Sequence, residues 1–78
     1  MQTVDRVVNI LHAVSSAADG LTLTEVAREV GLAPATTHRL LTSLSAAGMV
    51  ERRDSRRWYG GAGLRELGQA GAAQPPAA

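Results

Sequence analysis

The sequence contains no cysteine, so a disulfide framework and a thiolate metal site are excluded. Its two histidines, His12 and His38, are too few to hold a metal ion without help from carboxylates. We therefore expect no metal, no redox centre and no other cofactor. No apolar run approaches the length of a membrane span, and the first residues show no basic stretch followed by an apolar one. These absences favour a cytoplasmic protein.

A large excess of positive charge is absent as well. The formal net charge is +1 over 78 residues, which argues against binding of nucleic acid through bulk charge alone. The charges are unevenly distributed, however. The early acidic residues are Asp5, Asp19, Glu25 and Glu29. The later basic residues are Arg39, Arg52, Arg53, Arg56 and Arg57. If this small single domain binds nucleic acid, we expect its later, basic half to make the contact.

Residues 22–48 carry the clearest pattern in the chain, which predicts two short helices joined by a tight turn. Thr22 can cap the backbone amide of Glu25, and the Glu25 side chain can reach back to the amide of Thr22, which is a capping box. Leu21 can add a hydrophobic staple, and Gly31 supplies a left-handed residue that ends such a helix. The apolar face of this first helix is expected to be Leu23, Val26, Ala27 and Val30.

The second helix of the pair is expected to begin at Pro34, a first helical position that tolerates proline, and to end at Gly48. Its core stripe is predicted to be Thr37, Leu40, Leu41, Leu44 and Ala47. Its opposite stripe is Ala35, His38, Arg39 and Thr42. This arrangement is typical of a helix-turn-helix, whose second helix can enter the major groove and read base edges, above all through arginine on guanine. The residues alone also allow an ordinary helical hairpin with a solvated polar face.

The chain before this pair predicts one more helix. Thr3 can cap it, and the helix is expected to reach Ala17 or Ala18. Its apolar positions are Val4, Val7, Val8, Ile10, Leu11 and Val14. Residues 20–22 are then expected to form a short extended segment, long enough for one rung of a strand.

Helical periodicity disappears in residues 49–61, which favour a β-hairpin around a polar turn at Asp54 and Ser55. The two acids of this segment cannot pair with all four of its arginines, so its tip is expected to be basic. Beside a helix-turn-helix the hairpin is expected to act as a wing, although its charge also suits an edge hairpin that resists aggregation. Trp58 is expected to anchor it in the core. Strand alternation predicts that Arg52 and Arg53 point to opposite faces, one of them away from DNA.

The last residues predict little structure. Leu64 and Leu67 could lie on one side of a short helix, and from Gly68 the composition is reduced to glycine, alanine, glutamine and proline, which favours a flexible tail or the beginning of a linker. The whole chain is then mainly α with a small β-hairpin, in the order helix, short strand, helix, helix, hairpin. This order is that of a winged helix-turn-helix, with three helices plus a wing.

Three segments, GLTLTEVAREVGL, THRLLTSLSAAGMVER and GLRELG, resemble the N-terminal DNA-binding domain of the IclR family of bacterial transcription regulators. The likeness extends over residues 3–68. It implies a linker helix and a larger effector-binding domain after this domain, and dimers or tetramers that bind operator DNA. On this basis we expect residues 1–63 to form the DNA-binding domain, and residues 64–78 to form the start of a linker helix and a flexible tail, with the effector domain absent.

The sequence departs from the family's pattern at both expected contact regions. Pro34 and Ala35 stand where the family usually has a polar or basic residue and then a serine, and Ala33 is a weak cap. In the wing, the family often has a glycine near the tip, where this sequence has Arg56. The family also often has an apolar residue before the closing glycine, where this sequence has Gly60. A more basic and less tightly packed wing is therefore expected.

Thr36, His38 and Arg39 match the family's pattern, so the resemblance implies that they take part in recognition. The reading helix is expected at about residues 34–47 in the major groove, and the basic wing at about residues 49–60 on the backbone or in the minor groove. The candidate DNA-contacting residues are Thr22, Ala35, Thr36, His38, Arg39, Thr42, Arg52, Arg53, Arg56 and Arg57.

The predicted function is sequence-specific binding of double-stranded DNA as the DNA-binding domain of a transcription regulator. An enzyme is not expected, because no catalytic cysteine, no acid pair near His38 and no phosphate loop can be assembled. The full-length protein is expected to be a homo-oligomer, whereas this chain alone should associate weakly or not at all. The alternative function is a winged-helix module for protein–protein interaction without sequence-specific DNA binding, which would lack the steep salt dependence of DNA binding.

Overall fold

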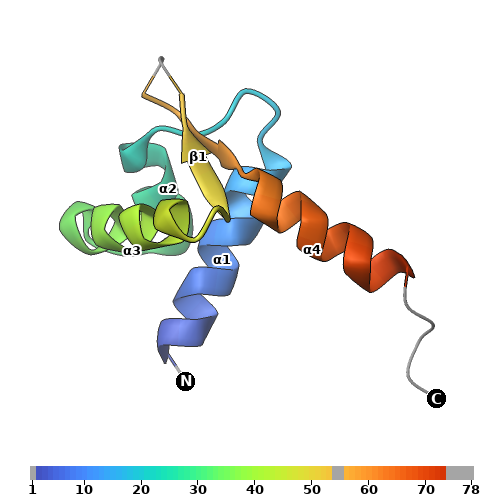
Figure 1. The fold of residues 1–78 in the computed structure, drawn as a ribbon. Coiled ribbons are helices and arrows are strands. Elements are labelled where there is room, and N and C mark those ends of the chain that lie inside the picture. Colours follow the sequence, from blue (N-terminus) through green and yellow to red (C-terminus); the bar gives the residue numbers. More distant parts are fainter. Residues whose placement is uncertain (1, 54–55, 74–78) are drawn as a thin grey trace.

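The structure of the protein is a computed structural model that describes residues 2–53 and 56–73. Its elements are α1 (Gln2–Ser16), α2 (Leu23–Val30), α3 (Pro34–Ala46), β1 (Val50–Arg52), β2 (Trp58–Gly60) and α4 (Ala62–Ala73). Figure 1 shows the first three helices packed together with the two-stranded hairpin against them, and α4 pointing away from this group. The fold is mainly helical with one small hairpin, as predicted. No helix in the described part of the chain is long and apolar enough to cross a membrane.

The core lies where α1, α2, α3 and the hairpin meet. Its buried side chains are Ile10, Val14, Val26, Leu41, Val50 and Trp58. All five elements contribute to this cluster, so the removal of apolar surface from water is what joins them. Trp58 is only 5% exposed, which confirms the prediction that it anchors the hairpin on the helices.

α1 differs from the predicted first helix at both ends. It begins at Gln2, so Thr3 lies inside the helix and the prediction that Thr3 caps it is wrong. It ends at Ser16, before the predicted Ala17 or Ala18. The Ser16 hydroxyl donates to the carbonyl oxygen four residues earlier, at 2.8 Å, and such side-chain bonds to the backbone compete with continuation of a helix.

The apolar stripe of α1 is only partly used by the core. Ile10 and Val14 are 0% and 1% exposed, whereas Val4 and Val8 are 52% and 44% exposed. The second half of α1 therefore packs against the domain, and its first half carries apolar surface that the described residues leave uncovered.

The ends of α2 form as the sequence predicts. The Thr22 hydroxyl accepts a hydrogen bond from the Glu25 amide at 3.2 Å, and the Thr22 amide donates to Glu25 Oε1 at 2.9 Å, which completes the capping box. Gly31 ends the helix in the left-handed conformation, with φ of 72°. The Leu32 amide then donates back to the Ala27 carbonyl at 3.0 Å, which satisfies a carbonyl group at the end of the helix.

α3 ends in a Schellman turn. The amides of Gly48 and Met49 donate to the carbonyl groups of Ser45 and Leu44 at 3.0 Å and 2.9 Å, and Gly48 has a φ of 78°. The predicted stop at this glycine is confirmed. Ala47, however, is exposed at the end of the helix, so its predicted place in the core stripe is wrong.

The two strands form an antiparallel pair with Val50 opposite Gly60, Glu51 opposite Tyr59, and Arg52 opposite Trp58. Leu21 adds one antiparallel bridge to Trp58, which confirms the single rung predicted before α2. The hairpin is confirmed as well, and its predicted turn at Asp54 and Ser55 lies outside the described residues.

α4 is longer than the sequence suggested. It runs from Ala62 to Ala73, so of the two expectations for the segment from Gly68 the flexible tail is wrong for residues 68–73, and the beginning of a linker stays a prediction. Its first turn lies directly on the loop after α3, where the Gly63 amide donates to the Gly48 carbonyl at 2.8 Å. A Cβ added at Gly61 would lie 2.5 Å from the same carbonyl oxygen, so only glycine allows this close approach.

Candidate nucleic-acid interface

α3 presents one polar face to solvent, as its two stripes predict. The exposed residues of this face are Ala35, His38, Arg39 and Thr42. On the other side Thr37 and Leu41 are fully buried, and the Thr37 hydroxyl donates to the Ala33 carbonyl at 3.0 Å. Ala33 itself makes no side-chain cap, which confirms that it is a weak one. The side chains of the polar face are therefore available to a partner without disturbing the core.

Two threonine side chains of α3, Thr36 and Thr42, are less freely placed. Thr36 is half-buried, so less of it can reach a partner. The Thr42 hydroxyl donates to the His38 carbonyl at 2.9 Å. Its proton is used inside the helix, and what it can offer to a partner is an acceptor oxygen.

A groove of about 400 Å³ lies between the beginning of α2, α3 and the hairpin. Its lining residues are Thr22, Leu23, Thr24, His38, Arg52, Arg56 and Trp58. Trp58 connects the two walls: the His38 ring meets it edge-on, with centroids 6.5 Å apart, and the Arg52 guanidinium carbon lies 5.9 Å from its ring centroid. α3 and the hairpin thus bring His38, Arg52 and Arg56 to one site. No acidic side chain is among the described residues that line it.

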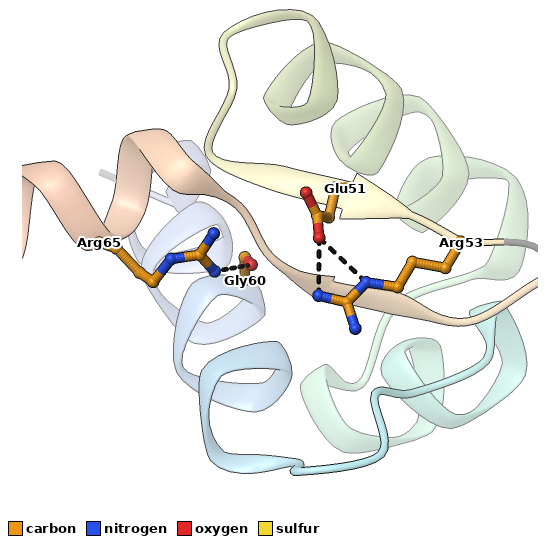
Figure 2. Close-up of polar contacts among 4 residues, drawn as sticks. All are labelled: Glu51, Arg53, Gly60 and Arg65. Carbon is orange, nitrogen blue, oxygen red and sulfur yellow. Dashed lines mark hydrogen bonds and ion pairs between the residues drawn. The ribbon is translucent and has the colours of Figure 1, made fainter.

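Arg52 and Arg53 lie on opposite faces of the hairpin, as strand alternation predicts. Arg53 Nε and Nη2 donate to Glu51 Oε1 at 3.0 Å and 2.8 Å, and its guanidinium carbon lies 4.0 Å from the Tyr59 ring centroid. Figure 2 shows this pair on the hairpin. Because Arg53 already has a carboxylate and an aromatic ring as partners, it is a weaker candidate for DNA contact than Arg52.

Arg65 on α4 also bonds to the hairpin. Arg65 Nη1 donates to the Gly60 carbonyl at 3.1 Å, and Figure 2 shows its side chain reaching back from α4 to this strand. This bond ties the first turn of α4 to β2, away from the groove beside α3.

Arg56 and Arg57 are neighbours in the chain but differ in their surroundings. Arg56 is exposed, lines the groove and has a φ of 61°, in the left-handed region that favours glycine. Arg57 is half-buried: its Nη1 donates to the Gly20 carbonyl at 3.2 Å and lies 3.6 Å from Glu25 Oε1. The sequence predicted one shared role for the two residues, and the structure gives them different contacts.

Thr22, a predicted DNA contact, lies in the groove wall and also caps α2. Hydrogen bonds from the backbone and the side chain of Thr22 hold the pKa of the Glu25 carboxyl below its ordinary value, and the nearby Arg57 acts in the same direction. The Thr22 hydroxyl accepts from the Glu25 amide and also bonds to the Glu25 carboxyl, so both its acceptor and its proton serve the cap of α2.

Sequence reasoning missed Thr24, which is exposed in the groove wall beside Thr22. Thr24 lies two residues after the cap Thr22, in the first turn of α2. The first amides of a helix have no partner inside the helix and attract anions, so this position could have been predicted to lie near a phosphate group. Within residues 2–53 and 56–73 there is no group of three or more His, Cys, Asp or Glu side chains that could hold a metal ion.

The fold is a winged helix-turn-helix. Its elements follow in the order α1, the single strand rung at Leu21, α2, a turn, α3 and the hairpin of β1 and β2. Residues 3–54 match the IclR helix-turn-helix domain, and the chain belongs to this family. It is a DNA-binding domain of the kind found in transcription regulators, and not an enzyme.

Individual relatives agree with this assignment. A curated relative, the HTH-type transcriptional regulator BhcR of Paracoccus denitrificans, is 41% identical over 51 residues, which are 65% of this chain and 18% of that protein. An IclR transcriptional regulator from Alicyclobacillus acidocaldarius is 29% identical, with a TM-score of 0.82 over 94% of this chain and 30% of that one. Pseudomonas aeruginosa HmgR, 21% identical, shares the fold with a TM-score of 0.83 over 96% of this chain and 32% of that one. The chain thus spans less than a third of each of these proteins.

Proposed function

We propose that this chain is the sequence-reading module of a transcription regulator, with α3 in the major groove of DNA and the hairpin on the adjoining backbone or minor groove. The groove between α3 and the hairpin is the observation that carries the proposal. Arg52, Arg56 and His38 line it, with no acidic side chain among its described lining residues. A phosphate backbone is attracted to such a site because no carboxylate among the described lining residues offsets the two arginine charges.

Arg39 is proposed to read a base, because it projects from the exposed face of α3 and arginine can bond guanine through two donors at once. His38 and Thr42 lie on the same face, and the Ala35 methyl group suits contact with the methyl group of a thymine. Thr36 contributes less, because it is half-buried. These assignments separate the base readers on α3 from the backbone contacts of the wing.

The test begins with selection of preferred duplexes from a random pool by the wild-type chain. Binding of the selected duplexes is then measured by fluorescence anisotropy between about 50 and 200 mM salt, a range over which phosphate contacts give a steep loss of affinity. Arg39→Ala should weaken binding by about 1–3 kcal/mol and relax the preference at one base position. Arg65→Ala is the matched control, because Arg65 lies on α4, which points away from α3, and its loss should leave both properties unchanged.

Two outcomes would contradict this proposal. An equal loss on every duplex after Arg39→Ala would show that Arg39 holds phosphate and reads no base. An absence of DNA binding by the wild-type chain at the lowest salt would favour the alternative, a module for protein–protein interaction.

Self-association is a second part of the proposal. Val4 and Val8 on α1 and Leu67 on α4 are exposed, and a mainly apolar groove of about 310 Å³ lies between α1 and α4, lined in part by Leu11 and Leu64. Exposed apolar surface of this kind is typical of contact with a partner. We assign it to a second copy in the full-length regulator, since a single small module seldom reaches regulatory affinity. A cytoplasmic location, where the regulator can reach its operator, belongs to the same proposal.

The isolated chain is then expected to be monomeric or weakly dimeric and to bind a two-half-site operator poorly. Fusion of an unrelated dimerisation domain after Ala78 should restore tight binding to half-sites about 34 Å apart, because linkage raises the local concentration of the second module. Sedimentation of the isolated chain and binding to one-half-site and two-half-site duplexes measure this. A tight dimer of the isolated chain, or no gain in affinity from the fusion, contradicts it.

A further inference from the structure

We propose that Arg57 is a positioning residue that holds the wing against the beginning of α2, and that it does not itself contact DNA. This inference rests on the proposed function, because it assigns Arg57 a role in orienting the groove that receives the DNA backbone. The sequence predicts that Arg56 and Arg57 both contact the DNA backbone or the minor groove.

Three consecutive residues before α2 are bonded to the hairpin or to the carboxylate beside it. The Gly20 carbonyl accepts from Arg57 Nη1 at 3.2 Å. The Leu21 amide donates to the Trp58 carbonyl at 3.0 Å, and the Trp58 amide donates to the Leu21 carbonyl at 2.7 Å. The Thr22 amide donates to Glu25 Oε1, and the same oxygen atom lies 3.6 Å from Arg57 Nη1. One guanidinium group therefore joins the strand to both the loop and the capping box.

The close approach at Gly20 is an independent sign that this contact is built into the fold. Gly20 has a φ of 72°, and a Cβ at this position would lie 2.8 Å from the Trp58 carbonyl oxygen and 2.8 Å from an atom of the Tyr59 ring. Only a residue without a side chain lets the loop lie this close to β2. The loop and the strand are held in contact, and Arg57 bonds to the loop at that glycine.

The hairpin needs such an attachment because its strands are short. Each strand has three residues, and a two-stranded hairpin is marginal on its own in water. Trp58 fixes one face of the hairpin in the core, and Arg57, the residue before β2, fixes the side toward α2. Loss of the Arg57 bonds would allow the wing to move relative to α3, and Arg56 would then no longer be held at the position that suits the DNA backbone.

The first measurement concerns the free protein and does not depend on DNA. Hydrogen exchange of the Leu21 and Trp58 amides is followed by NMR under conditions where every variant is folded. Arg57→Ala should speed exchange at these two amides by about threefold to tenfold, because one neighbouring hydrogen bond to the local structure is lost. Arg56→Ala is the matched control and should leave both rates unchanged. Arg57→Gln keeps a side-chain N–H donor without the charge, and it serves as the milder variant if Arg57→Ala does not fold.

The second measurement is a double-mutant cycle of DNA affinity with Arg56→Ala and Arg57→Ala. A residue that acts through the wing should matter less once the wing contact is gone, so Arg57→Ala is expected to cost about tenfold in the wild-type background and less than about threefold in the Arg56→Ala background. Additive losses would mean that Arg57 contacts DNA independently, and unchanged amide exchange would mean that it does not hold the wing; either result overturns the proposal. If the wild-type chain binds no DNA, the proposed function fails, while the exchange measurement still reports whether Arg57 holds the wing.

Discussion

Replacement of Arg56 by glycine should change stability and DNA binding in opposite directions. Arg56 has a φ of 61°, and the left-handed conformation costs a residue with a side chain about 1–2 kcal/mol. Glycine removes that cost but loses about 0.5–1 kcal/mol through its larger backbone freedom in the unfolded chain. Together the two ranges give a net gain in the free energy of unfolding of about 0–1.5 kcal/mol, with a central value of about 0.5–1 kcal/mol. For a domain of this size, that corresponds to a rise in Tm of about 2–8 °C.

The same substitution removes a guanidinium group from the groove beside α3. If Arg56 neutralises one phosphate, the slope of log affinity against log salt should fall in magnitude by about 0.9. Preference among duplex sequences should stay the same, because phosphate contacts carry no direct sequence information. Thermal unfolding followed by circular dichroism measures the first effect, and anisotropy titrations at several salt concentrations measure the second.

Arg56→Ala separates the two causes. Alanine keeps a side chain in the left-handed conformation, so it should lose the phosphate contact without the gain in Tm. The reasoning is refuted if Arg56→Gly melts at or below the wild-type temperature, or if it binds DNA with an unchanged salt slope. In the first case the backbone at Arg56 is not strained, and in the second its guanidinium does not touch the DNA backbone.

Other substitutions test separate parts of the structure. Thr37→Val should leave DNA binding intact and leave the Tm unchanged or slightly higher, because the Ala33 carbonyl that accepts the hydroxyl also accepts the Thr37 amide; a lower Tm would contradict this. Glu25→Gln tests the pH dependence of stability: since the pKa of Glu25 is lowered in the folded state, its contribution is present above the ordinary carboxyl pKa and is lost as the pH falls through the lowered value. The variant should therefore lose less stability than the wild type in acid unfolding, and parallel pH profiles would refute this. Gly20→Ala should destabilise the domain by about 1–3 kcal/mol because of its positive φ and the contact with β2, and a wild-type denaturation midpoint would show that the loop can relax.

Both ends of α2 and the glycine stop after α3 were predictable from the sequence because they depend on local chemistry, whereas both ends of α1 differ from the prediction. The capping box of Thr22 and Glu25 and the left-handed glycines Gly31 and Gly48 involve residues only a few positions apart, so their meaning does not change with the rest of the fold. The burial of Thr37 on α3 followed from helical periodicity for the same reason. The simple composition from Gly68 onward predicts a flexible tail or the beginning of a linker, and composition alone does not separate a tail from a helix. Alanine is also the best helix former, and α4 continues to Ala73.

Only the tertiary structure decided which arginines form hydrogen bonds and ion pairs within the protein. Residues 52, 53, 56 and 57 are the same residue type within six positions, and alternation alone could separate Arg52 from Arg53. The different surroundings of Arg56 and Arg57 depend on Gly20 and on Glu25, which lie more than thirty residues earlier in the chain. A sequence pattern specifies contacts along one helix or strand. The folding of the chain specifies which distant carbonyl or carboxylate group comes within hydrogen-bonding distance of a given guanidinium.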